Sequence, residues 1–313
     1  MSVTRASLIR GPGIVSWNSA TIFSEGDIAP RYEPVWNPVQ TSMYGEVDRV
    51  RRDFVIRIPI RLWGAWENLA TLFPSALLNP TIGASLYGTS DTPLSITARN
   101  GDKVTYNNAQ ITRLADLRLG VDENIFAADV EFTAILANNT LPESNAAYYT
   151  VATGQTFTES AFAKTKFKRE RWTGAWGTKT GWTTVVPKDG FHVGWELGLA
   201  PVTVDGYGTV DMTIRGLVAT CRCVPIGPSL AQIEEEIKLA GQSGAGAAHG
   251  TLVSTNAADL VLTSSSMGVT LKNVSLTKGG HAFGQEPLRM GEVEWTSARL
   301  FTAGVPQAVA TLS

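Results

Sequence analysis

An internal repeat is the feature that most constrains how this chain can fold. Residues 38–48 match residues 201–211, so the offset is 201 minus 38, or 163, and six of the eleven aligned residues are identical. The same offset pairs residues 129–133 (Asp-Val-Glu-Phe-Thr) with residues 292–296 (Glu-Val-Glu-Trp-Thr). Matching blocks that keep one order along a chain indicate a tandem duplication, which sets the architecture before any local pattern is considered.

The offset changes slightly along the chain, as expected where loops differ in length between two copies. It is 165 for residues 104–108, which match residues 269–273, and 159 for Trp17, which matches Trp176. A polar stretch at residues 137–144 follows the first set of matching blocks and is typical of a linker. The duplication therefore extends over most of the chain.

Length and composition agree with two globular units. We predict two domains, residues 1–149 and residues 150–313, since 313 residues exceed the usual size of one domain. Hydrophobic residues make up 43% of the chain, charged residues make up 17%, and the net charge is −2. These values favour a globular protein and indicate no general affinity for nucleic acid.

The sequence also excludes several kinds of site. No run of residues has the length and apolar character of a signal peptide or a membrane span, which predicts folding in a cytoplasm and no contact with a membrane. Cys221 and Cys223, the only cysteines, have a spacing that puts both on one face of a strand and disfavours a disulfide between them. The three histidines, His192, His249 and His281, are scattered along the chain. We therefore expect neither a metal site nor a bound cofactor.

Each copy has the pattern of an antiparallel all-β domain. Short segments rich in β-branched and aromatic residues, such as residues 54–60 and 130–135, are separated by Gly, Asn, Asp and Pro. One helix is expected in each copy, over residues 65–73 and residues 229–240, because apolar residues recur there at helical spacing. Each helix has a single apolar stripe and should cover the outside of its sheet.

No signature of an enzyme stands out. The chain has no Gly-x-Ser-x-Gly motif and no Walker-type loop, and the glycine-rich segment at residues 241–246 does not join a strand to a helix as a dinucleotide loop must. We therefore predict a protein without catalytic residues.

Two acidic pairs occupy the same place in the two copies. Asp129 and Glu131 alternate with apolar residues in the first copy, and Glu292 and Glu294 do so in the second. Alternation puts each pair on one face of a strand and the apolar residues on the other. A solvated sheet face explains either pair alone, but the repetition favours a shared role for that face.

The opening of the chain resembles that of phage tail tube proteins. Residues 10–23 read Arg-Gly-Pro-Gly-Ile-Val-Ser-Trp-Asn-Ser-Ala-Thr-Ile-Phe, and Gly-Asp-Ile follows at residues 26–28. The Tyr-Gly-Glu-Val-Asp turn at residues 44–48, the apolar strand after it, and Leu-Phe-Pro at residues 72–74 extend the resemblance over most of the first copy. The resemblance implies a β-sandwich with one flanking helix in each copy.

The resemblance also implies a function. Tail tube proteins build rings of six domains that stack into a conduit, and members with a duplicated domain need three chains for each ring. The expected role is thus a structural virion protein of the tail, made in a bacterial host. Its expected partners are copies of itself, the tape-measure protein, the tail terminator and the distal tail protein, with DNA passing through unbound. The alternative is a two-domain β-sandwich binding module of a virion, such as a terminator, distal tail or carbohydrate-binding protein.

Two surfaces follow from this expectation. The face with Asp129, Glu131, Glu292 and Glu294 is predicted to line the channel, where its carboxylates would repel DNA. Arg57 and Arg61 share a strand face and could also reach the channel or pair with these acids.

A second surface is predicted to join successive rings. The segment from Val35 to Arg52, with Pro38, Tyr44, Gly45 and Asp48, is expected to be a mobile loop, too long for a tight hairpin, that orders against the next ring.

Overall fold

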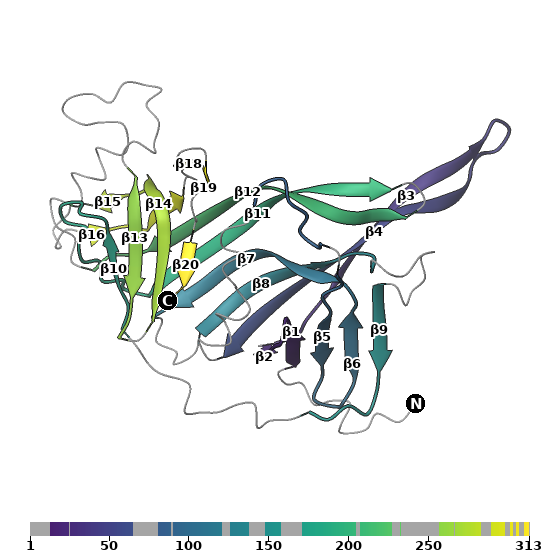
Figure 1. Ribbon diagram of the computed structural model, residues 1–313, viewed down its shortest axis with the longest axis horizontal. Helices are drawn as coiled ribbons and strands as arrows, with labels where there is room; N and C mark the ends of the chain where they lie inside the picture. Colours follow the sequence, from purple (N-terminus) through teal and green to yellow (C-terminus); the bar gives the residue numbers. More distant parts are fainter. Residues whose placement is uncertain are drawn as a thin grey trace.

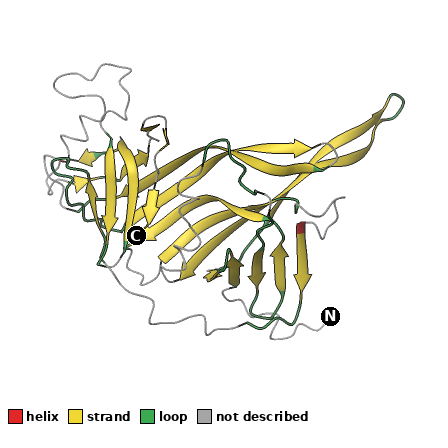
Figure 2. Cartoon of the chain, viewed as in Figure 1, coloured by secondary structure: helices red, strands yellow, loops and turns green. Residues whose placement is uncertain are grey.

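The chain folds almost entirely into antiparallel β-structure. The computed structural model describes residues 13–24, 26–64, 81–88, 90–120, 126–137, 148–157, 171–204, 207–226, 232, 257–265, 267–282, 289–297, 301–302, 305–306 and 310–312. Strands and their connecting turns account for nearly all of them (Figure 2). The predicted all-β class is therefore confirmed.

Strands of the first copy come first in the chain. They are β1 (Ile14–Trp17), β2 (Ala20–Ser24), β3 (Arg31–Thr41), β4 (Gly45–Gly64), β5 (Leu94–Thr97), β6 (Lys103–Tyr106), β7 (Ala109–Leu119), β8 (Phe126–Ala134) and β9 (Tyr149–Ala152). Those of the second copy are β10 (Thr173–Trp176), β11 (Phe191–Val204), β12 (Gly208–Cys223), β13 (Ala258–Thr263), β14 (Gly268–Lys278), β15 (His281–Ala282), β16 (Arg289–Met290), β17 (Val293–Ser297), β18 (Phe301–Thr302), β19 (Val305–Pro306) and β20 (Ala310–Leu312).

Most of these strands belong to one open sheet. Its order is β10-β13-β14-β17-β12-β11-β7-β8-β4-β2-β1-β5-β6-β9, with β3 paired to β4 and β20 paired to β14 (Figure 1). The middle of this order contains the same four-strand block twice, side by side. The block is β7-β8-β4-β3 in the first copy and β14-β17-β12-β11 in the second.

The two blocks share their strand register. Each pair of opposite residues on β4 and β8 has its equivalent on β12 and β17, 163 residues later. The pair Ile58–Phe132 matches Cys221–Trp295, Ile60–Val130 matches Cys223–Val293, and Arg57–Thr133 matches Thr220–Thr296. A one-residue slip would turn every side chain of a strand to the opposite face. Equal register therefore gives both copies the same buried face and the same open face.

A β-bulge is also repeated. The register of β7 against β8 shifts at Thr112, and that of β14 against β17 shifts at Thr277. The Thr112 hydroxyl lies 2.9 Å from the hydroxyl of Thr133 and donates to the carbonyl of Glu131 at 3.3 Å. Thr277 makes the same two contacts with the equivalent residues, at 2.9 and 3.3 Å. The extra residue of each bulge is thus bonded across the ladder.

The two blocks join through unlike edges. Strand β11 pairs antiparallel with β7, from Phe191 opposite Leu119 to Glu196 opposite Arg113. In its own block β11 holds the place that β3 holds in the first copy. The second block is thus attached to the first through the outer edge of β11. The equivalent edge of β3, at the other end of the row of strands, has no partner strand among the described residues.

Outer strands pack against one face of the blocks. Strands β1, β5, β6 and β9 lie beside the first block, and β10 and β13 lie toward the other end of the sheet (Figure 1). Trp17 packs edge-on to Phe132 with ring centroids 5.6 Å apart, and Trp176 packs in the same way on Trp295 at 6.3 Å. The largest buried apolar cluster includes residues of both copies, so one core continues through the junction.

The predicted helices at residues 65–73 and 229–240 lie outside the described residues, apart from Gln232, which is helical and buried. The predicted domain boundary after residue 149 falls at the start of β9, which pairs with β6 of the first copy.

The expected mobile loop is instead a long hairpin. Strands β3 and β4 pair from Arg31 opposite Arg57 to Thr41 opposite Gly45, and together they project as an arm (Figure 1). Strand β3 contains two prolines, Pro34 and Pro38. Proline is tolerated here because β3 is an edge strand, whose outward backbone positions need no donor.

Candidate functional site

The first acidic pair lies on the open face of the first block. Asp129 and Glu131 are partly exposed, whereas Val130, which lies between them, is 3% exposed and Phe132, which follows them, is 0% exposed. Alternation along β8 therefore separates an outward polar face from the core, as the sequence predicts.

The second acidic pair has the equivalent position. Glu292 and Glu294 are partly exposed, and Val293 and Trp295 are fully buried. The two pairs share one face of one sheet, but β12, β11 and β7 lie between them. The structure thus places all four predicted residues on a common face without bringing the two pairs into contact.

Arginines neutralise the first pair. Arg61 binds Asp129 through two hydrogen bonds of 2.6 and 3.2 Å, and Arg57 donates to Glu131 at 3.1 Å. Arg57 also donates to Glu33 on the neighbouring strand at 2.9 Å. The possibility that Arg57 and Arg61 pair with these acids is therefore confirmed.

Basic residues also flank the second pair. Lys278 donates to Glu292 at 2.9 Å, and Arg222 lies 3.8 Å from the same carboxylate. The hydrogen bond from Lys278 lowers the pKa of Glu292 and raises that of Lys278 itself. Both groups are largely exposed, so these interactions orient the side chains more than they stabilise the fold.

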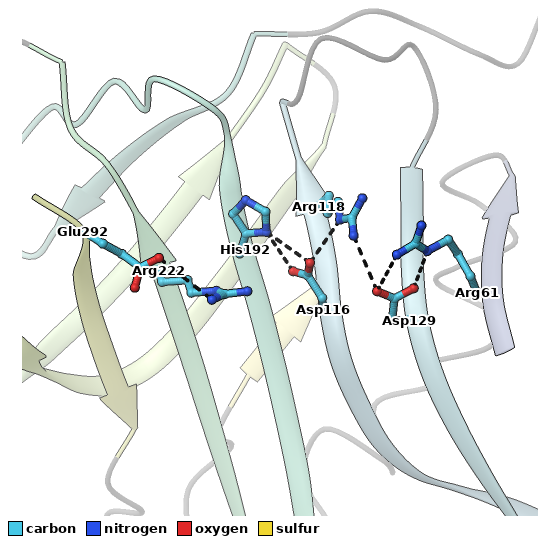
Figure 3. A network of polar contacts seen from close by, with 7 residues as sticks. All are labelled: Arg61, Asp116, Arg118, Asp129, His192, Arg222 and Glu292. Carbon is cyan, nitrogen blue, oxygen red and sulfur yellow. Dashed lines mark hydrogen bonds and ion pairs between the residues drawn. The ribbon is translucent and has the colours of Figure 1, made fainter. Parts of the chain in front are cut away.

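A chain of polar contacts crosses the junction between the copies (Figure 3). His192 of β11 lies 2.9 Å from the carboxylate of Asp116 on β7, and Arg118 donates to the same carboxylate at 3.0 Å. Arg118 also lies 3.6 Å from Asp129, which continues the chain to Arg61 on β4. Burial tends to raise the pKa of Asp116, but the contacts with His192 and Arg118 outweigh it and hold this pKa below its ordinary value.

Charge alternates from strand to strand along this face. We call the face the charged face. Its described acidic side chains include Glu33, Asp53, Asp116, Asp129, Glu131, Glu196, Glu292 and Glu294, and its described basic side chains include Arg31, Arg57, Arg61, Arg113, Arg118, Arg222 and Lys278. One row runs from Glu33 through Arg57, Glu131 and Arg113 to Glu196. The charged face is thus close to neutral, and repulsion of DNA does not follow from its carboxylates.

A groove opens on the charged face beside the junction. Its volume is about 780 Å³, and its described lining includes Arg57, Arg113, Glu131 and Glu196. The described lining contains no cysteine, histidine or aromatic residue. It offers hydrogen bonds and charge, but its described lining has no aromatic platform on which a sugar ring could stack.

The predicted stacking residues lie on the β3–β4 arm. Pro38, Tyr44, Gly45 and Asp48 are all exposed, and Tyr44 keeps 77% of its surface accessible. Gly45 ends the tight turn with a φ of 69°, a backbone conformation that only glycine adopts easily. The four residues are thus brought together near the tip, far from the acidic pairs.

The arm rests on the second copy at its base. The Asp53 carboxylate accepts hydrogen bonds from the backbone N–H of Thr209 at 2.7 Å and from its hydroxyl at 2.6 Å. This contact fixes the turn of the β11–β12 hairpin against the first copy. Sequence reasoning missed it, as it missed Asp116, Arg118 and His192.

One signal could have indicated the junction network. Asp116 and Arg118 are two residues apart on a strand, the spacing that puts side chains on one face. Nothing local assigns His192 as their partner, because it lies 76 residues from Asp116.

No group of three or more His, Cys, Asp and Glu side chains in the described ranges is arranged to hold a metal ion. Cys221 and Cys223 are free thiols on the buried face of β12. In the part of the chain that the structure describes, no helix has the length and apolar character needed to cross a membrane.

Comparison with known proteins identifies no family. The sequence matches no protein-family model, and no curated protein is significantly similar to it.

Proposed function

We propose that the chain is a tail tube subunit of a long-tailed bacteriophage, a structural protein that assembles into stacked rings. One observation carries the proposal: the same four-strand block occurs twice, side by side, and the copies join by unlike edges. A contact between unlike edges can be repeated from chain to chain, and such contacts close into rings when the rotation permits.

The dimensions of such a ring suit a conduit. Two blocks of four strands give eight strands for each chain, so three chains supply 24 strands. Strands about 4.8 Å apart and tilted by about 40° each occupy about 6 Å of circumference, which gives a diameter of about 48 Å. The channel left by the side chains would admit duplex DNA.

The charged face supplies the inner wall in this proposal. Its side chains point away from the buried core, and its mixed charge would neither bind nor strongly repel a polyanion. DNA and the tape-measure protein would pass along it. The role is assembly, with no catalytic step.

The tube is favoured over a virion binding module by the composition of the groove. A carbohydrate-binding module needs aromatic rings in a recess, and the described lining of this groove has none. A terminator or distal tail protein shares the ring geometry and is separated from a tube subunit by whether its rings stack.

Electron microscopy of the purified full-length chain, over a range of concentrations and with native mass measurement, tests the proposal. We expect stacked rings of three chains, each ring having a mass of about 100 kDa from three chains of 33.5 kDa. Rings of six chains, or a protein that remains monomeric up to millimolar concentration and when mixed with tail tips, would contradict it. Single rings that never stack would favour the terminator or distal tail protein.

A further inference from the structure

Equivalent strands of the two copies differ sharply in exposure. Tyr32 on β3 is 56% exposed, whereas Trp195, its equivalent on β11 (32 plus 163), is 4% exposed. Every residue of β3 is at least partly exposed. The difference arises because β11 is covered along its outer edge by β7, while in the described structure β3 pairs with β4 alone.

The second copy has an open edge at the other end of the row of strands, opposite to β3. Strand β7 receives β11 along residues 113–119. At the offset of 165 the equivalent segment of the second copy starts at Lys278, the last residue of β14, which pairs with Glu294 of β17. It continues through residues 279–280 to β15, which pairs with β16 in a separate two-stranded sheet. Among the described residues, no strand pairs with residues 278–282 on their outer side. Lys278 at its start has a side chain that is 59% exposed.

Charge at the two open edges is complementary. At the internal junction Arg113 lies 3.5 Å from Glu196. Their equivalents are Lys278 (113 plus 165) and Glu33 (196 minus 163), one on each open edge. The alternation of acidic and basic strands would therefore continue without a break from one chain to the next.

We infer that residues 30–33 of one chain, at the start of β3, pair antiparallel with residues 278–282 of a second copy, with Glu33 opposite Lys278. The contact reproduces the internal junction, buries Tyr32 as Trp195 is buried, and gives the ring of the proposed tube, on which this inference rests, its closing contact. Its occupant is a second copy because the charge and register of the two open edges match those of the internal junction.

Strand pairing and the ion pair have different tasks in this contact. Backbone hydrogen bonds of residues 31–33, which precede Pro34, and the burial of Tyr32 supply most of the affinity, since open strand edges are templates for pairing. A surface ion pair adds little energy, but opposed like charges at this position would disfavour the correct register.

Disulfide trapping tests the register directly. In the double variant Glu33→Cys/Lys278→Cys, oxidation should link separate chains into dimers and trimers, because directly opposite residues have Cβ atoms about 4.5–5.5 Å apart. The variant Arg113→Cys/Glu196→Cys is the matched control and should form the same bond within one chain. Burial raises the pKa of Cys223 to about 12 and that of Cys221 well above its usual value, so the native thiols will not compete.

Charge reversal gives an independent readout. Glu33→Lys and Lys278→Glu should each raise the protein concentration needed for assembly by about tenfold, and the double reversal should restore most of the loss. Lys188→Glu, an exposed lysine away from both edges, should leave assembly unchanged.

The outcomes separate this contact from the proposed function. Cross-linked chains without tubes would support the contact and overturn the tube. Tubes whose chains do not cross-link, while the Arg113→Cys/Glu196→Cys control does, would overturn the register and leave the tube standing. Absence of both products, with the control bond formed, would overturn both.

Discussion

Equivalent tryptophans anchor the two copies in the same way. The indole of Trp17 donates to the carbonyl of Ala109 at 2.8 Å, and that of Trp176 donates to the carbonyl of Val274 at 3.0 Å. The second acceptor lies 165 residues after the first, the offset found for that part of the repeat. Each bond satisfies the N–H group of a buried indole and ties a covering strand to its block.

Truncating Trp295 should be costly, because it is fully buried and packs edge-on to both Trp176 and Trp182. We expect Trp295→Ala to lower the free energy of unfolding by about 3–5 kcal/mol, and lysine at this position to prevent folding. Urea denaturation followed by circular dichroism measures the alanine variant. Val218→Ala, at a 48% exposed position of β12, should change stability by less than about 0.5 kcal/mol. An equal loss in the two alanine variants would contradict this account of the core.

The Asp116 carboxylate should make stability depend on pH. Its pKa is held below the ordinary value of about 3.9, so the folded state binds this proton less readily than the unfolded chain. Its contribution is therefore present above about pH 4 and is lost as pH falls through the folded pKa. Asp116→Asn should lose about 1–2 kcal/mol near neutral pH and progressively less below pH 4.

Denaturation midpoints measured between pH 3 and pH 7 test this expectation. Asp189→Asn, which removes the same charge from an exposed position, is the control. A deficit in Asp116→Asn that stays constant across this range would show that the network with His192 and Arg118 is not its origin.

At the scale of elements, the β3–β4 arm projects from the rest of the sheet (Figure 1). Its two strands pair from Arg31 opposite Arg57 to Thr41 opposite Gly45, yet Met43 and Tyr44 at the turn are 82% and 77% exposed. Apolar side chains on a projecting hairpin favour contact with another chain. Asp53, by contrast, ties the base of the arm to Thr209 and holds its direction.

Removing the tip should separate folding from assembly. Deletion of residues 41–46, with the strands rejoined through Asn-Gly, should leave the melting temperature nearly unchanged, because the removed residues are exposed. The same variant should fail to form long tubes. Circular dichroism and electron microscopy give the two readouts, and tubes of normal length would show that stacking contacts lie elsewhere.

At the scale of the whole molecule, the charged face is continuous across both copies. Acidic and basic side chains meet across neighbouring strands, and the joining of β7 to β11 adds the contact of Arg113 with Glu196. Paired charges of opposite sign release few counterions to an approaching polyanion. The balance is therefore a property of the joined sheet and of neither copy alone.

Neutralising the four predicted carboxylates should unmask the basic half of this face. The variant Asp129→Asn/Glu131→Gln/Glu292→Gln/Glu294→Gln raises the net charge from −2 to +2. We expect it to bind duplex DNA with an affinity that falls steeply between about 50 and 200 mM salt, as for clustered phosphate contacts. Fluorescence anisotropy with labelled DNA measures both the affinity and its salt dependence.

A charge-matched variant shows whether position matters. Asn in place of four exposed aspartates off the face, Asp27, Asp48, Asp102 and Asp189, gives the same net charge. It should bind DNA more weakly than the variant of the charged face. Equal binding by the two would mean that net charge alone governs the interaction.

The sequence by itself determined the repeat, the β-class and the faces of individual strands. Alternation over residues 129–132 and 292–295 is local, and a period of two turns Phe132 and Trp295 inward wherever the strand is placed. Arg57 and Arg61 could be suggested as partners of the acids for the same reason.

Only the tertiary structure decided how the copies join and which charges meet. The pairing of β7 with β11 brings His192 to Asp116 across 76 residues, and that of β4 with β8 brings Arg61 to Asp129 across 68. The tertiary structure also decided that β3 and β4 form a hairpin in place of a loop, because Pro34 and Pro38 are compatible with a strand only at the edge of a sheet. Strand partners are chosen by core packing and register over the whole chain, and no local pattern carries that choice.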